Sequence, residues 1–113
     1  MAQEYNNLAN SYEERYNAST TNLSKIGARG YDTTQFGTYN LWDYVSLRED
    51  GSLDTSGGAS GNSLQDLYNS GISDDLKEKI ETWIEDYNTE WETQQESLEG
   101  LKDAADEIRD LES

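Results

Sequence analysis

Mostly apolar side chains recur at helical spacing near the start of the chain. They follow alternating steps of four and three, at Tyr5, Ala9, Tyr12, Tyr16, Ser19, Leu23 and Ile26. Steps of this size place all of these side chains on one face of an α-helix. Gly27 and Gly30 come next and favour a helix end. The pattern therefore predicts one helix over about residues 3–27.

The last part of the chain carries the clearest periodic pattern. Ser73 fits an N-cap, and Asp74 and Asp75 follow it, where acidic side chains favour the positive end of the helix dipole. Steps of four and three then connect a predicted heptad seam: Ile80, Ile84, Tyr87, Trp91, Gln94, Leu98, Leu101, Ala105 and Ile108. Proline is absent, and Gly100 is a weak point that costs about 1 kcal/mol relative to alanine. We expect one long helix over about residues 74–111.

The middle of the chain fits no single period. The stretch TYNLWDYVSL, residues 38–47, fits either a short helix capped by Thr38 or a short strand, and we favour the helix. The following REDGSLDTSGGASGNS is rich in Gly, Ser and Asp, and it predicts a flexible loop over about 50–62. SLQDLYNSG then predicts a two-turn helix with Ser63 as its cap, Asp66 three residues on and Gly71 at its end.

Together these elements predict an all-α fold in a single domain, residues 1–113. A helical hairpin or small bundle is expected, in which the N-terminal helix packs antiparallel on part of the long C-terminal heptad helix. Short helices and a Gly/Ser-rich loop fill residues 31–72. The core is expected to be thin because only 33% of the residues are hydrophobic, although 8 Tyr and 3 Trp supply large side chains. A homodimer is one way to reinforce such a core.

Charge narrows the class of partner. The net charge is −16, and residues 74–113 contribute −11 of it, from fifteen acids and four bases. A surface this acidic repels phosphates, which excludes direct binding of nucleic acid. We expect its partner to be a basic protein surface, most naturally that of a nucleic-acid-binding protein.

Location follows from the absence of targeting patterns. No apolar run approaches the roughly 20 residues that a membrane span requires, and MAQEYNNLAN lacks the features of a signal peptide. We therefore expect no membrane contact and a cytoplasmic location, which is the host cytoplasm if the protein is viral.

The residues that carry most catalysis are missing. The chain contains no His and no Cys, which removes the commonest general base, thiol nucleophile and transition-metal ligands. The segment SGGASGNS lacks the lysine of a phosphate-binding loop, and DGSLDTS lacks the spacing and closing Glu of an EF-hand. We therefore expect no enzyme activity, no cofactor and no metal site.

Acidic residues form a second pattern on the predicted long helix. One column beside the seam holds an acid every seven residues, at Glu78, Glu85, Glu92, Glu99 and Asp106. With the interleaved column it gives a row that we call the acidic ridge: Glu92, Glu96, Glu99, Asp103, Asp106 and Asp110. Like charges at this spacing each cost a helix a few tenths of a kcal/mol. The row is thus either a plain solvated face or a surface that imitates nucleic-acid phosphates.

Two further expectations concern the partner. Trp83 lies beside the predicted seam, so we expect it to be available to a partner, together with Glu78, Glu85 and the acidic ridge. In size, charge and helix content, although not in any motif, the chain resembles the phage-encoded DNA-mimic inhibitors of restriction or CRISPR enzymes.

Alternative functions remain open. The first is a structural or assembly protein, for example a virion component, that oligomerises or docks through its heptad helix, with Gln94 setting the register. The second is a secreted helical-hairpin effector or a chaperone for a basic client. The Trp-x-Gly turn typical of one such secreted family is missing, because LWDY has no Gly.

Overall fold

The computed structural model describes residues 2–112, and within this range the side chains of residues 9–106. The elements, in order, are α1 (Ala2–Gly30), a 3-10 helix (Leu41–Asp43), β1 (Ser46–Leu47), β2 (Leu53–Asp54), α2 (Leu64–Asn69) and α3 (Asp74–Glu112). The fold is therefore mostly helical, with a long C-terminal helix and a small two-stranded sheet. The prediction of an all-α fold is wrong in that it did not include this two-stranded sheet.

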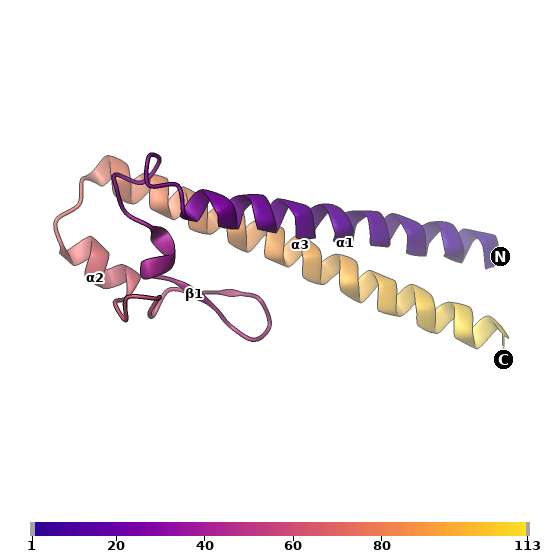
Figure 1. Cartoon of the computed structure of the whole chain (residues 1–113). Coiled ribbons are helices and arrows are strands. Elements are labelled where there is room, and N and C mark those ends of the chain that lie inside the picture. The colour runs from indigo at the N-terminus through magenta and orange to yellow at the C-terminus, as the bar shows by residue number, and fades with distance from the viewer. Residues whose placement is uncertain (1, 113) are drawn as a thin grey trace.

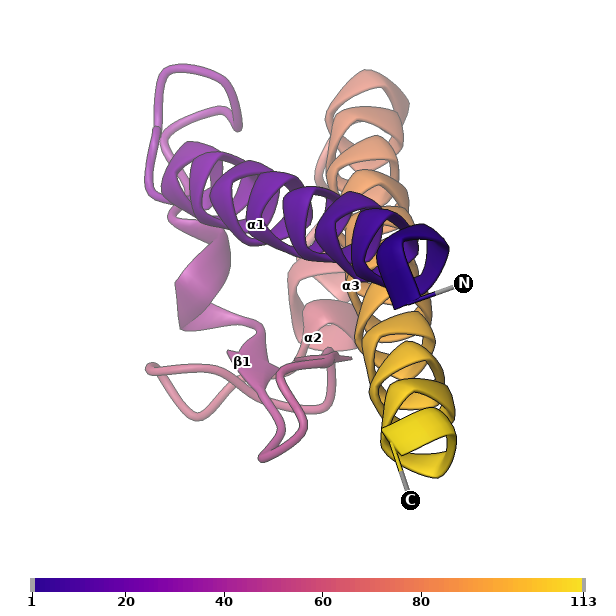
Figure 2. The ribbon, with the colours of Figure 1, turned by 90° about the vertical axis from the view of Figure 1, so that its right-hand side faces the viewer.

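The two long helices define an elongated molecule of 61 × 22 × 18 Å. Helices α1 and α3 run in opposite directions, so the described N- and C-terminal ends lie at the same end (Figure 1). Viewed end-on, the two helices cross at an angle rather than lying parallel (Figure 2). The middle segment, residues 31–73, packs against one end of the helix pair and leaves the other end as two helices alone.

The predicted face of the N-terminal helix is confirmed. Ser19 is buried, and Tyr12, Tyr16, Leu23 and Ile26 are half-buried on the side that faces α3. Tyr5 lies outside the described side chains.

Helix α1 continues three residues past the predicted end, to Gly30. A Cβ at position 30 would lie 2.8 Å from ring atoms of both Trp42 and Trp83. Close packing of two indoles therefore explains the glycine at this helix end.

Helix α3 is one unbroken helix, as predicted, but its buried face differs from the predicted seam. One column is common to both: Ile80, Tyr87, Gln94 and Leu101. The other column toward α1 is Trp83, Glu90, Ser97 and Ala104, in place of the predicted Ile84, Trp91, Leu98 and Ala105. Ala104 is 3% exposed, for example, whereas Ala105 is exposed. Ile108 lies outside the described side chains.

The shift has a packing cause. Ser97, Gly100 and Ala104 are small, and the ring of Tyr12 from α1 lies against Gly100, where a Cβ would overlap it. The more apolar column is turned toward the middle segment, where Ile84 packs on the core and the Trp91 Nε1 donates to the Asp50 carbonyl at 3.1 Å. Helix α3 therefore divides its apolar surface between two neighbours.

The middle segment contains a hairpin that the sequence did not predict. Residues 38–47 hold both candidate structures, a 3-10 helix and then β1, and the helix is capped by the Asn40 side chain rather than by Thr38. Strand β2 falls inside the predicted loop and pairs antiparallel with β1, with Leu47 opposite Leu53. Leu53 is only 6% exposed, so this part of the loop is anchored in the core.

Helix α2 forms where it was predicted. Ser63 and Asp66 make the reciprocal hydrogen bonds of a capping box, which satisfy two donors at the start of the helix. Gly71, just beyond the C-cap, has a φ of +91°, a conformation that favours glycine.

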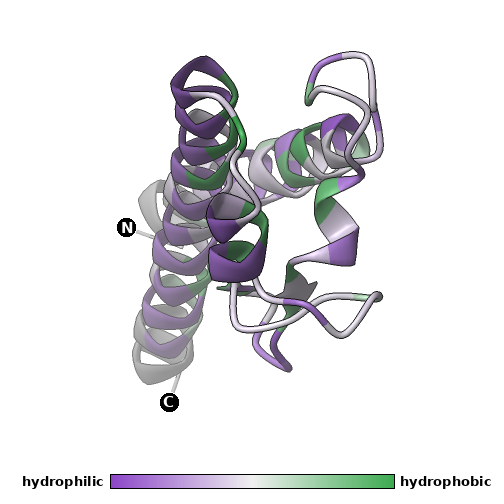
Figure 3. Ribbon diagram, turned by 90° about the vertical axis from the view of Figure 1, so that its left-hand side faces the viewer, coloured by the Kyte–Doolittle hydropathy of each residue, from purple (hydrophilic) through white to green (hydrophobic). Residues whose placement is uncertain are grey.

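The buried leucines of α2 belong to the hydrophobic core of the protein. This core cluster consists of Phe36, Leu41, Val45, Leu53, Leu64, Leu67, Ile80, Trp83 and Tyr87. Figure 3 shows that much of α3 is hydrophilic, with hydrophobic positions interspersed along it.

Candidate functional site

The described part of the acidic ridge lies on the solvent side of α3. All five described members are exposed: Glu92, Glu96, Glu99, Asp103 and Asp106. The sixth member, Asp110, is not among the residues whose side chains are described. Successive residues of a helix are about 100° apart, so these positions lie roughly opposite the column that packs on α1. Glu78 and Glu85 are exposed as well and extend the acidic surface toward the start of the helix.

The ridge carboxylates have no partner among the described side chains. Within residues 9–106, the one ion pair joins Arg29 to Asp86 at 3.2 Å, and no described side chain hydrogen bonds to a ridge carboxylate. Lys102, three residues after Glu99 and four before Asp106, is the described cation nearest the ridge along the helix, and it forms no ion pair with either residue.

The density of charge on the ridge is lower than that of a nucleic acid. From Glu92 to Asp106 the axial distance is about 21 Å at 1.5 Å per residue, or about 5 Å per charge. Each strand of a DNA duplex carries one charge per about 3.4 Å. Asp86 and Glu90 do not close this gap, because Asp86 is paired with Arg29 and Glu90 lies in the half-buried column of α3 that faces α1.

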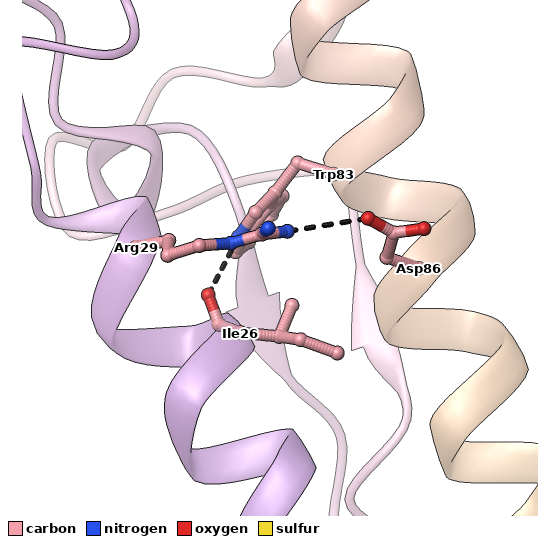
Figure 4. A network of polar contacts seen from close by, with 4 residues as sticks. All are labelled: Ile26, Arg29, Trp83 and Asp86. Atoms are coloured by element: carbon pink, nitrogen blue, oxygen red, sulfur yellow. Dashed lines mark hydrogen bonds and ion pairs between the residues drawn. The ribbon is translucent and has the colours of Figure 1, made fainter.

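Trp83 is not available to a partner, so this expectation is wrong. Its side chain is 1% exposed, and its Nε1 donates to the Ile26 carbonyl at 2.7 Å, beside the Arg29–Asp86 pair (Figure 4). The ring of Trp42 meets it edge-on, with centroids 5.6 Å apart. Trp83 belongs to the column of α3 that faces α1, so it forms the centre of the core.

A second candidate surface is an open groove of about 470 Å³ between α1, α3, the 3-10 helix and β1. We call it the aromatic groove; its lining residues are Thr20, Leu23, Ser24, Gly27, Ala28, Tyr31, Trp42, Leu47, Tyr87 and Gln94. None of them is charged, although 28% of the chain is. Sequence reasoning missed this groove because its residues come from four separate segments. The 8 Tyr and 3 Trp of the chain are a hint of it in the composition alone.

Three aspartates shape the loops beside the groove. Asp32, Asp50 and Asp54 each accept hydrogen bonds from the hydroxyl and the backbone N–H of the residue two positions later. The serine or threonine hydroxyl is the main cause that lowers the pKa of each carboxyl below its ordinary value, and the backbone N–H adds to it. These turns hold the segments that carry Tyr31 and Leu47.

A mixed-charge pocket of about 570 Å³ lies on the other side of α1. It is lined by Arg29, Gln35, Phe36, Asp75, Glu78, Lys79, Thr82, Trp83 and Asp86. Its two cations stand among three carboxylates, so it favours no single class of ligand. Among the described side chains, no group of three or more carboxylates is placed to hold a metal ion.

Comparison with known protein families, with curated proteins and with solved structures found no match to this chain. Within residues 2–112, no helix combines the length and the apolar character needed to cross a membrane.

Proposed function

We propose that this protein is a non-enzymatic binding module whose acidic ridge docks on a basic surface of a nucleic-acid-binding protein. The observation that carries the proposal is the row of exposed carboxylates on one continuous helix, without described cationic neighbours in contact. Such a row attracts Lys and Arg over a distance and then pairs with them. Occupying these cations excludes nucleic acid, as phage-type inhibitors of restriction or CRISPR enzymes do.

The α1–α3 pair supplies the scaffold in this proposal. As an antiparallel helical hairpin, it holds the ridge on its outer side while the opposite side of α3 packs against α1. The spacing of about 5 Å per charge is too wide to copy a phosphate backbone charge by charge. The protein therefore competes for the cations of its target without reproducing the shape of a duplex.

Assembly through the heptad seam has less support. Gln94, which was expected to set the register between copies, donates to the Thr20 hydroxyl at 2.8 Å and so fixes the register of α3 on α1. The seam face of α3 is thus largely occupied by the chain itself.

Competition with DNA tests the proposed function. A labelled DNA duplex is bound at low salt to each of several basic targets, including a restriction endonuclease and an RNA-guided nuclease, and the protein is then titrated in. We expect displacement of the DNA from at least one target, weakened about tenfold by Glu96→Gln/Glu99→Gln, since two charge-assisted contacts supply about 1.4 kcal/mol. Glu13→Gln/Glu14→Gln removes the same charge from exposed positions on α1 and should change the titration by less than about twofold. If the protein displaces DNA from none of the targets at low salt, the proposal is refuted.

A further inference from the structure

We infer that the aromatic groove is a second binding site, which takes an apolar side chain carried on a basic segment of a partner protein. The groove is separate from the acidic ridge, and its occupancy does not require that the ridge binds anything. The inference therefore goes beyond the proposed function.

The exposed apolar surface of the protein is concentrated at this groove. Among the described side chains, two large hydrophobic residues are exposed, Tyr31 at 62% and Leu47 at 51%, and both line it. Single exposed apolar residues are common on any surface, but their convergence on one uncharged groove marks an interaction site.

The groove has a preformed aromatic wall. The Trp42 Nε1 donates to the Gly27 carbonyl at 2.8 Å, which fixes the indole against the end of α1. The ring of Tyr31 lies 5.8 Å from that of Trp42, and the ring of Tyr87 lies 6.4 Å away on α3. A fixed wall lowers the entropy cost of binding, and about 470 Å³ lies within the range of pockets that hold small ligands.

The charged residues around the groove indicate that the apolar side chain belongs to a basic segment of the partner. Residues 20–54, which supply all of the lining except Tyr87 and Gln94, hold five acids and three bases, a balance of −2. Two of these bases are engaged: Arg29 pairs with Asp86 at 3.2 Å, and the Arg48 Nη1 donates to the Ser52 hydroxyl at 3.2 Å and to the Leu53 carbonyl at 3.0 Å. An uncharged wall within acidic surroundings fits an apolar residue flanked by Lys or Arg. A second copy of the chain would bring another −16 and is repelled.

Two defined peptides test this inference. Both are dodecamers of alternating Lys and Ser with a fluorescent label, and they differ at one central residue, which is Leu in the first and Ser in the second. We expect the Leu peptide to bind about tenfold tighter by fluorescence anisotropy, because partial burial of a leucine side chain supplies that ratio. Amide shifts in a nitrogen–proton NMR spectrum should appear along residues 20–31 and at Leu47.

Variants separate the groove from the ridge. Tyr31→Ser/Leu47→Ser should remove the preference for the Leu peptide, while Leu98→Ser, a half-buried leucine outside the groove, should keep it. Circular dichroism should show that each variant keeps its helix content. Glu96→Gln/Glu99→Gln should leave the ratio between the peptides unchanged, so failure of the ridge proposal does not alter this result.

Three results would overturn the inference. The first is equal affinity for the two peptides, and the second is a preference that survives Tyr31→Ser/Leu47→Ser. The third is self-association of the protein that this double variant abolishes in sedimentation, because the groove would then belong to a second copy.

Discussion

Replacing Gly100 with alanine tests the packing of α1 on α3, because two effects predict opposite signs. In a helix interior, alanine is about 0.8–1.0 kcal/mol more favourable than glycine. In this structure, however, the new Cβ would overlap the half-buried ring of Tyr12. Overpacking of this kind costs about 1–3 kcal/mol. We therefore expect Gly100→Ala to lower the free energy of unfolding by about 1 kcal/mol.

The Tyr12→Ala background supplies the control for this prediction. Without the ring, the alanine at position 100 meets no overlap, and it should raise the free energy of unfolding by about 0.8–1.0 kcal/mol relative to Tyr12→Ala alone. Urea unfolding followed by far-ultraviolet circular dichroism measures all four proteins. The change of sign corresponds to a coupling energy of about 2 kcal/mol between the two positions. Equal stabilisation by alanine in both backgrounds would show that Tyr12 does not pack on Gly100.

Three other predictions follow from the described contacts. Trp83→Phe removes the hydrogen bond to the Ile26 carbonyl in the core, and should lower the free energy of unfolding in urea by about 1–3 kcal/mol, more than Trp91→Phe, whose hydrogen bond is exposed. Sodium chloride should raise the melting temperature in calorimetry, because screening relieves repulsion within a chain of charge −16; no change would contradict this. The lowered pKa of Asp50 means that its turn contributes stability above its unfolded pKa of about 3.9, which is lost as pH falls through the folded value. Ser52→Ala should return that pKa toward the ordinary value in a carboxyl NMR titration, and an unchanged pKa would exclude the hydroxyl as the cause.

The long helices could be predicted from the sequence because their signals are local. The spacing of apolar residues located α1 and α3, and the Ser63–Asp66 pair located the start of α2. Each of these signals depends on residues within one or two turns of one another, and neither proline nor a long break interrupts them.

The orientation of α3 could not be predicted, because two columns compete for the same seam. The column of Ile84 and Trp91 is the more apolar, and sequence alone favours it. What decides between the columns is the partner across the seam, since the Tyr12 ring requires Gly100 and small neighbours. Because the prediction assigned the column of Ile84 and Trp91 to the seam, it also placed Trp83 at the surface, although Trp83 lies in the core. The acidic column was less affected, because its exposed members are far from either seam.

The hairpin and the aromatic groove depend on contacts between distant segments. The loop around β2 has the composition of a flexible linker, and Leu53 alone anchors that strand in the core. Leu47 and Tyr31 meet in the groove only after the chain has folded back over α1. No short-range pattern in the sequence carries this information.

The three indole N–H groups report on different junctions of the fold. Those of Trp42 and Trp83 bond to the last turns of α1, while that of Trp91 joins α3 to the hairpin. Their exchange with heavy water should therefore occur in two stages, since the exposed Trp91 site opens by local motion and the other two only when α1 detaches. One proton spectrum recorded over time would thus order the steps in which this molecule comes apart.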